Sequence, residues 1–256
     1  MDLKLDIASA EGYESHSQRV RIITESWTES NMFCPRCGEA KLRHFPNNRA
    51  VADFYCPSCK NEYELKSKKR SVGKKITDGA YSTFIQRITS NNNPDFFILI
   101  YDRSQWYVKD FLIVPKHFFT PKVVEKRNPL HKGRQRAGWI GCNILFSEIP
   151  EQGKISIIKD RIPVDQASVI AQVRKSNLLQ EPNIEKRGWL FDILNCINQI
   201  PRDTFTLEEA YRFETKLKQL HPQNNNIRPK IRQQLQILRD KKIINFLGQG
   251  IYQKIK

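Results

Sequence analysis

The sequence predicts a mixed α/β domain followed by a smaller, mostly helical domain that ends in a β-hairpin. Two apolar runs rich in aromatic residues, 96–101 and 106–114, have the composition of buried strands. Apolar residues at helical spacing precede and follow them, and the pattern changes after a polar stretch with a proline at 180–186. We therefore place the two domains at residues 1–182 and 183–256.

The first domain is expected to alternate helices and strands. Val20, Ile23 and Trp27 have helical spacing and predict a helix near residues 15–27, whereas residues 32–66 have the pattern of loops and short strands. Thr77 is a suitable N-cap for a second helix, which the sequence Asn-Asn-Asn-Pro at 91–94 would end. A further strand pair is predicted near residues 139–145 and 155–158.

The second domain has the pattern of a winged helix, with three helices and a hairpin in about seventy residues. The helices are expected at 188–200, at 207–220 after the cap Thr206, and at 227–240. The third helix would enter the major groove of DNA, where Arg and Gln side chains pair with base edges. Its candidate DNA contacts are Arg228, Lys230, Arg232, Gln233 and Gln234. The alternative is a protein-binding winged helix with a basic face.

The charge of the chain indicates an anionic partner. Lys and Arg number 43 against 27 Asp and Glu, a formal net charge of +16. Nucleic acid is the leading partner, ahead of a merely basic protein with solvated charges and of a membrane surface. No apolar run approaches the roughly 18 residues of a membrane span, and the N-terminus is too polar for a signal peptide. We expect a cytoplasmic protein with reduced thiols, so its six cysteines favour metal binding over disulfides.

Four of the cysteines have the spacing of a zinc site. Cys34 and Cys37 form one CxxC pair, and Cys56 and Cys59 form a second pair after an eighteen-residue spacer. Two such pairs can place four thiolates around one tetrahedral Zn²⁺. Four cysteine ligands leave no open position, so this zinc is predicted to be structural. His44, between the pairs, is expected to be a loop residue, and Cys142 and Cys196 are expected to be small core residues.

Three charged residues next to the second CxxC pair form a candidate catalytic site. The segments before and after the cysteine loop are expected to pair as strands, with Glu64 and Lys66 on one face and Asp53 opposite them. Two neighbouring carboxylates can hold a divalent cation, and a nearby ammonium can orient or activate a water. The arrangement suits metal-assisted hydrolysis of a phosphodiester. An ordinary surface ion pair is the alternative.

Asp53, Glu64 and Lys66 resemble the PD-(D/E)XK nuclease motif, with Ala52 in place of its proline. The longer stretches NNRAVADFYCPSC, YELKSKK, TDGAY, RAGWIGCNI and RQQLQILRDKKII resemble the methylation-dependent restriction endonucleases of the DpnI family over nearly the whole chain. The resemblance implies a restriction-endonuclease-like α/β domain with a four-cysteine zinc site, then a winged helix. It also implies a type IIM enzyme that cuts double-stranded DNA at GATC sites carrying N6-methyladenine.

Matched to the family pattern, Asp53 and Glu64 would bind Mg²⁺, and Lys66 would position or activate the attacking water. Cys34, Cys37, Cys56 and Cys59 would be the zinc ligands. Both domains would recognise the methylated site, and the family expectation is a monomer.

A basic segment at 132–139 offers a physical means of sensing the methyl groups. Arg134 and Arg136 could hold phosphates, and the indole of Trp139 could pack on the adenine methyls. Trp139 could instead begin a core strand, and Trp189 in the second domain is expected to be a core residue.

Two alternatives remain open. One is a transcription regulator with a zinc ribbon and a winged helix but no nuclease activity. The other is a nuclease of the same fold that cuts a different or unmethylated site.

Overall fold

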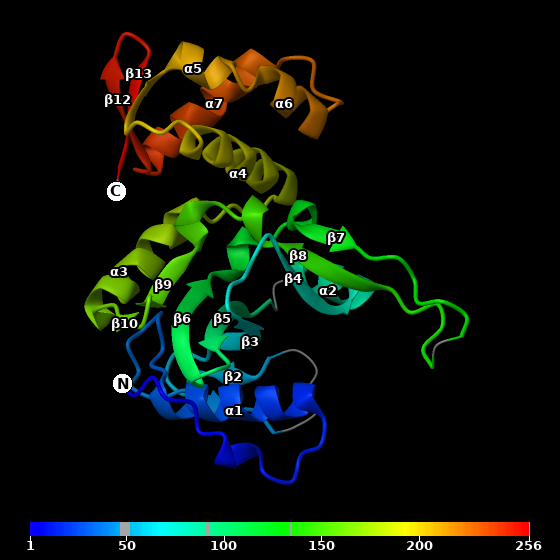
Figure 1. Ribbon diagram of the computed structural model, residues 1–256. Helices are drawn as coiled ribbons and strands as arrows, with labels where there is room; N and C mark the ends of the chain where they lie inside the picture. Colours follow the sequence, from blue (N-terminus) through cyan, green and yellow to red (C-terminus); the bar gives the residue numbers. More distant parts are fainter. Residues whose placement is uncertain (47–51, 91–92, 134, 256) are drawn as a thin grey trace. The chain divides into compact units, whose positions relative to one another are not determined.

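A computed structural model of the chain describes residues 1–46, 52–90, 93–133 and 135–255 (Figure 1). The chain divides into two compact units, Met1–Asn177 and Leu178–Lys256. None of the described helices is both long and apolar enough to cross a membrane.

A mixed sheet forms the centre of the first unit. Its strand order is β1-β2-β3-β5-β6-β9-β10, where β3 and β5 are parallel and the other neighbours are antiparallel. The strands are β1 (Arg43–His44), β2 (Phe54–Tyr55), β3 (Glu62–Lys69), β5 (Asp95–Asp102), β6 (Tyr107–Val114), β9 (Ile155–Lys159) and β10 (Ile162–Pro163). Nearly every residue of β5 is buried, as the apolar run at 96–101 predicts.

Helices cover this sheet. Helix α1 (His16–Asn31) contacts β3 and buries Ile23 and Trp27, while α3 (Gln166–Ser176) packs near β9 (Figure 1). The apolar core between them includes Phe97, Phe111 and Val169. Helix α1 confirms the first predicted helix, whereas α3, capped by the side chain of Asp165, was not predicted.

A second sheet of the first unit has the order β4-β8-β7, with β4 (Lys75–Ala80), β7 (Val124–Lys126) and β8 (Gly141–Leu145). The segment between β7 and β8 extends away from the rest of the unit as an arm (Figure 1). We call residues 127–140 the arm; its residue 134 lies outside the described part.

Two local predictions are wrong in this region. Thr77 does not cap a helix: it lies in β4 and pairs with Asn143 of β8, and helix α2 (Tyr81–Thr89) begins only after Ala80. Pairing with β8 supplies backbone hydrogen bonds that outweigh the capping preference of one threonine. Strands β8 and β9 form near the predicted positions, but they belong to different sheets.

The second unit combines helices with a three-stranded sheet. The helices are α4 (Ile184–Asn198), α5 (Leu207–Tyr211), α6 (Glu214–Leu220) and α7 (Ile227–Asp240), and the strands are β11 (Thr204–Thr206), β12 (Ile244–Gly248) and β13 (Ile251–Lys254) in the order β11-β13-β12. Thr206 caps α5 through a complete capping box with Glu209. The predicted second helix is divided into α5 and α6, the first helix starts earlier than predicted, and β11 was not predicted.

Helix α7 and the β12–β13 hairpin confirm the predicted third helix and terminal hairpin. The apolar face of α7 is buried through Ile231, Leu235 and Leu238, and Trp189 of α4 is buried as expected. The amphipathic period of α7 therefore leaves its polar face exposed.

Candidate functional site

The two CxxC pairs fold into matching turns. In the first turn Cys34 N donates to Glu39 O (2.8 Å) and Gly38 N to Cys34 O (2.9 Å); in the second, Cys56 N donates to Asn61 O (2.9 Å) and Lys60 N to Cys56 O (3.0 Å). Gly38 and Lys60, each four residues after the first cysteine of its pair, both have positive φ. The same backbone geometry therefore presents both pairs of thiols.

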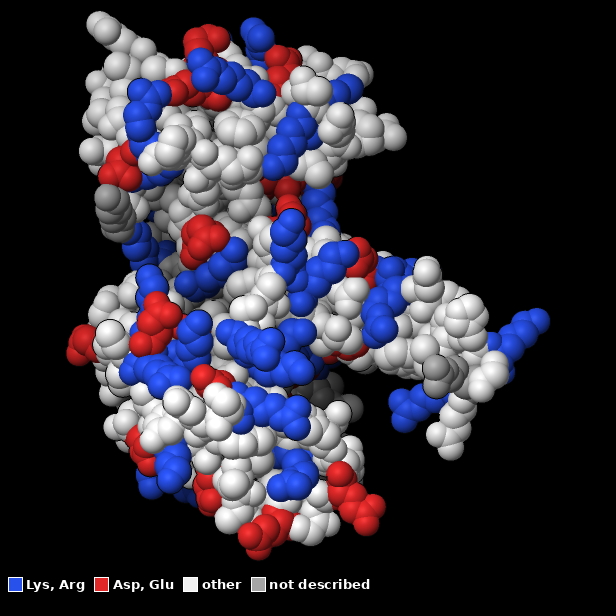
Figure 2. Space-filling view, in the orientation of Figure 1, with Lys and Arg blue, Asp and Glu red and all other residues white. Residues whose placement is uncertain are grey.

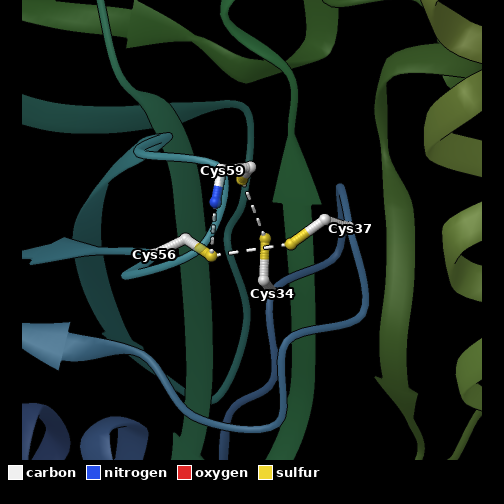
Figure 3. Close-up of side chains that lie close together, drawn as sticks. All are labelled: Cys34, Cys37, Cys56 and Cys59. Atoms are coloured by element: carbon white, nitrogen blue, oxygen red, sulfur yellow. Dashed lines mark hydrogen bonds between the residues drawn. The ribbon is translucent and has the colours of Figure 1, made fainter.

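The four sulfur atoms converge on one point (Figure 3). Their ligand atoms all lie within 4.8 Å of one another, with Cys34 Sγ and Cys59 Sγ 3.6 Å apart and Cys37 Sγ and Cys56 Sγ 3.5 Å apart. Zn–S bonds of about 2.3 Å in a tetrahedron place the sulfurs roughly 3.8 Å apart, so the donor set fits one Zn²⁺. The cluster supports the expected structural zinc.

The protein environment opposes ionisation of one of these thiols and favours that of another. Burial raises the pKa of the Cys34 thiol. At Cys37 the opposing effect of burial is outweighed by hydrogen bonds from the Glu39 backbone and the neighbouring cysteines, which lower the pKa to about 7. Zn²⁺ binds the thiolate form of cysteine.

A buried carboxylate fastens both turns to the main sheet. Asp95, fully buried at the start of β5, accepts hydrogen bonds from Arg36 Nε (2.9 Å), Asn61 Nδ2 (2.8 Å) and Lys116 N (2.8 Å). Arg36 lies in the first cysteine turn and Asn61 follows the second. His44 lies in β1, 3.2 Å from Glu25 Oε2, and takes no part in the sulfur cluster.

Asp53, Glu64 and Lys66 lie around the point where β2 and β3 separate. Asp53 directly precedes β2; its N donates to Tyr63 O (2.9 Å), and its Oδ2 accepts from Leu65 N (2.7 Å). Phe54 of β2 pairs with Tyr63 of β3 in antiparallel register. The next position along this register places Asp53 opposite Glu64, as the strand prediction required.

Glu64 and Lys66 are neighbours on one face of β3. Lys66 Nζ lies 2.6 Å from Glu64 Oε1, and Arg87 Nη1 of α2 lies 3.7 Å from Glu64 Oε2. Burial raises the pKa of Glu64, opposed by the charge of Lys66. Burial also opposes the charge of Lys66, but the carboxylates of Glu64 and Asp78 hold its pKa above the usual value. Lys66 is therefore an ammonium at neutral pH.

Asp78 is a member of this cluster that the sequence reasoning missed. Its Oδ1 lies 2.6 Å from Lys66 Nζ, the same distance as Glu64. Arg87 also adjoins the cluster, because its Nη1 atom lies 3.7 Å from Glu64 Oε2. Asp78 falls within TDGAY, a stretch already notable for its resemblance to the family, and this was the available signal.

Trp139 lies at the base of the arm and is half-buried. A Cβ atom built on Gly141 would lie 2.7 Å from Trp139 Cη2, so the indole rests directly on the first residue of β8. Trp139 O accepts from Leu130 N (2.9 Å), and Trp139 N donates to Arg136 O (3.0 Å). Arg136 is exposed on the arm, and Arg134 lies outside the described residues.

The candidate base-reading residues on α7 differ in exposure. Arg228, Arg232 and Gln233 are exposed, Lys230 is half-buried, and Gln234 is only 2% exposed. Arg228 and Arg232 lie against the ring of Tyr211, and Arg232 Nε donates to its hydroxyl. The burial of Gln234 follows from helical periodicity, because it shares a face with Ile227, Ile231 and Leu238. It is therefore not placed to read a base.

Basic side chains are prominent on the first unit. On the face visible in Figure 2, Lys and Arg gather over its centre and also occur on the arm. Such a surface attracts a polyanion, in agreement with the net charge of +16.

Two family models match the chain. The Dam-replacing family model (DpnI) matches residues 1–182, and the Dam-replacing HTH domain model (DpnI_C) matches residues 185–254. The first covers the sheet, the cysteine cluster and the Asp53, Glu64 and Lys66 site; the second covers the helices and hairpin of the DNA-binding unit. The chain belongs to the DpnI family: it is a methylation-dependent restriction endonuclease, a site-specific deoxyribonuclease with a C-terminal HTH domain.

Proposed function

We propose that the protein cuts double-stranded DNA at GATC sites carrying N6-methyladenine, in a reaction that requires Mg²⁺. The observation that carries the proposal is the meeting of Asp53, Glu64 and Lys66 at the separation of β2 and β3. Residues 1–182 would form the nuclease domain and residues 183–256 the winged helix, acting as a monomer.

The donor set at this point fits a magnesium ion. Asp53 and Glu64 offer carboxylate oxygens, and Mg²⁺ is commonly held by one or two carboxylates together with waters and substrate phosphates. When bound there, Mg²⁺ would supply Lewis-acid stabilisation of charge on the scissile phosphate and lower the pKa of a bound water. Asp53 and Glu64 would hold the ion.

Lys66 would orient the attacking water. Its ammonium is already held at the edge of the site by two carboxylates, so it has little freedom to rotate away. Two of the three N–H donors of the ammonium are used by these carboxylates, and the third can bind a water. Arg21 Nη2 lies 4.0 Å from Asp53 Oδ1, at the limit of an ion pair.

Two surfaces would contact the DNA. On the first unit these are Arg136 and Trp139 of the arm, with Arg136 on phosphates and the indole against the adenine methyls. On the second unit the exposed part of α7 would enter the major groove, through Arg228, Lys230, Arg232 and Gln233. The exposure of the α7 arginines supports this role.

The substitution Asp53→Ala tests the nuclease assignment directly. The variant should bind a methylated GATC duplex as tightly as the wild type in a gel shift and should not cut it in Mg²⁺. A variant that still cuts would remove Asp53 from the catalytic site. A wild type that binds but never cuts would favour a regulator.

A further inference from the structure

A fourth charged residue is built into the catalytic cluster. The ammonium of Lys66 lies between two carboxylates, 2.6 Å from Glu64 Oε1 and 2.6 Å from Asp78 Oδ1. The Asp78 side chain is 7% exposed, whereas the Lys66 side chain is 17% exposed. The Asp78 carboxylate is therefore more buried than the ammonium that it contacts.

A break in strand pairing aims Asp78 at Lys66. In the β4–β8 ladder Asp78 pairs with Cys142 and Ala80 with Gly141, so the register shifts at Gly79. Bulges of this kind re-aim a side chain and are frequent beside active sites. Gly79 N also donates to Asp78 Oδ1 (2.6 Å), which fixes the carboxylate in the orientation that meets the ammonium.

The second oxygen of the same carboxylate is buried without a hydrogen-bond partner among the described residues. Asp78 Oδ2 is such an atom, and so are Nε and Nη2 of Arg87. A buried, unsatisfied carboxylate oxygen is costly. The ion pair with Lys66 offsets part of this cost, so the charge of Asp78 is explained by its contact with Lys66.

We propose that Asp78 is a positioning residue that keeps Lys66 in the catalytic site when the metal is bound. This inference rests on the proposed function. Glu64 cannot serve Lys66 and Mg²⁺ equally, because a cation bound to Glu64 repels the neighbouring ammonium. Asp78 offers the ammonium a second carboxylate, which comes from β4 and not from the strand that carries Glu64. It holds Lys66 where a water can be oriented.

The experiment compares single-turnover cleavage of a methylated GATC duplex by the wild type, D78N and D78A over a range of Mg²⁺ concentrations. The matched control is Glu125→Gln, which breaks the exposed 2.5 Å contact between Lys75 and Glu125 in the same β4-β8-β7 sheet. DNA affinity is measured without Mg²⁺, and thermal unfolding is followed for every variant.

D78N and D78A should lose about 100-fold in the maximal cleavage rate, the size of effect expected when a proton-transfer or water-orienting group is misplaced. The half-saturating Mg²⁺ concentration and the DNA affinity should stay within about threefold of the wild type. Glu125→Gln should cut at the wild-type rate. A residue that only supports the fold is not expected to lower the maximal cleavage rate while leaving the half-saturating Mg²⁺ concentration and the DNA affinity unchanged.

Three results would overturn the inference while leaving the nuclease intact. They are cutting by D78N and D78A at the wild-type rate, recovery of their rate at high Mg²⁺ (which would make Asp78 a metal ligand), and a parallel fall of DNA affinity and thermal stability. If the wild type and Glu125→Gln also fail to cut, the proposed function falls together with the inference.

Discussion

The indole ring of Trp139 lies on Gly141, so closely that an added Cβ would be 2.7 Å from Cη2 and 2.8 Å from Cζ3. Gly141 is the first residue of β8 and pairs with Ala80, two residues from Asp78. The residue proposed to sense the methyl groups is therefore seated at the base of the arm, on the same sheet that presents Asp78 to the catalytic cluster.

Gly141→Ala should displace the Trp139 ring, because contacts below 3.0 Å force one of the two groups to move. We expect weaker preference for methylated DNA and a changed tryptophan emission spectrum, with a stability loss of about 1–3 kcal/mol. Cleavage rates on methylated and unmethylated duplexes measure the preference. If Gly141→Ala keeps the wild-type preference and emission spectrum, the packing of the Trp139 ring on Gly141 is not needed for methyl recognition.

Trp139→Ala should abolish discrimination between methylated and unmethylated GATC, because the apolar surface offered to the methyl groups is removed. Arg136→Ala is the comparison. Losing one phosphate contact should weaken binding of both duplexes alike, and the slope of log binding constant against log salt concentration should fall by about one. Binding titrations of both duplexes at several salt concentrations give both quantities. Undiminished discrimination by Trp139→Ala would refute the methyl-sensing role.

Removing the zinc should destabilise the first unit, since four thiols would be left clustered without their cation. Cys37→Ser should lower zinc content and reduce the unfolding midpoint by more than about 10 °C, at about 2–4 °C per kcal/mol lost. Zinc analysis and thermal unfolding followed by circular dichroism check both. Cys196→Ala removes a buried thiol of the other unit, so this control variant should have the zinc content of the wild type. Equal zinc content in Cys37→Ser would contradict the site.

Alanine in place of Arg228 or Arg232 should weaken DNA binding by about 5- to 100-fold, the range expected for an arginine at a base edge. Arg239→Ala is the matched control, because Arg239 is an exposed arginine in the last turn of the same helix. Its affinity should remain within about twofold of the wild type. If Arg232→Ala and Arg239→Ala lose the same DNA affinity, then α7 contributes only its positive charge to DNA binding and does not read bases.

The features predicted correctly from the sequence depend on local spacing. Each CxxC pair forms a turn through local backbone hydrogen bonds. Alternation along one strand places Glu64 beside Lys66, independently of how the rest of the chain folds. The period of α7 likewise separates its buried and exposed faces. It also buries Gln234, which its side-chain type and its place in the third helix had assigned to DNA reading.

What could not be predicted depends on pairing between distant segments. Thr77 and Asp78 have the composition of a helix start, and only pairing with β8 makes the segment a strand. The contact between Asp78 and Lys66 follows from a bulge in that pairing, so no spacing rule could have found it. Helix α3 begins at Gln166 after the cap Asp165 and was missed, although Val169, Ile170 and Val173 have helical spacing.

A plasmid digest in Mg²⁺, run in parallel on GATC-methylated and unmethylated DNA, tests the central claim most directly. Our account predicts discrete fragments with ends at GATC from the methylated plasmid, no cutting of the unmethylated one, and no cutting of either after Mg²⁺ is chelated. Equal cutting of both plasmids would contradict the methyl-dependent recognition that we propose, and fragments with ends at other sequences would contradict the GATC assignment.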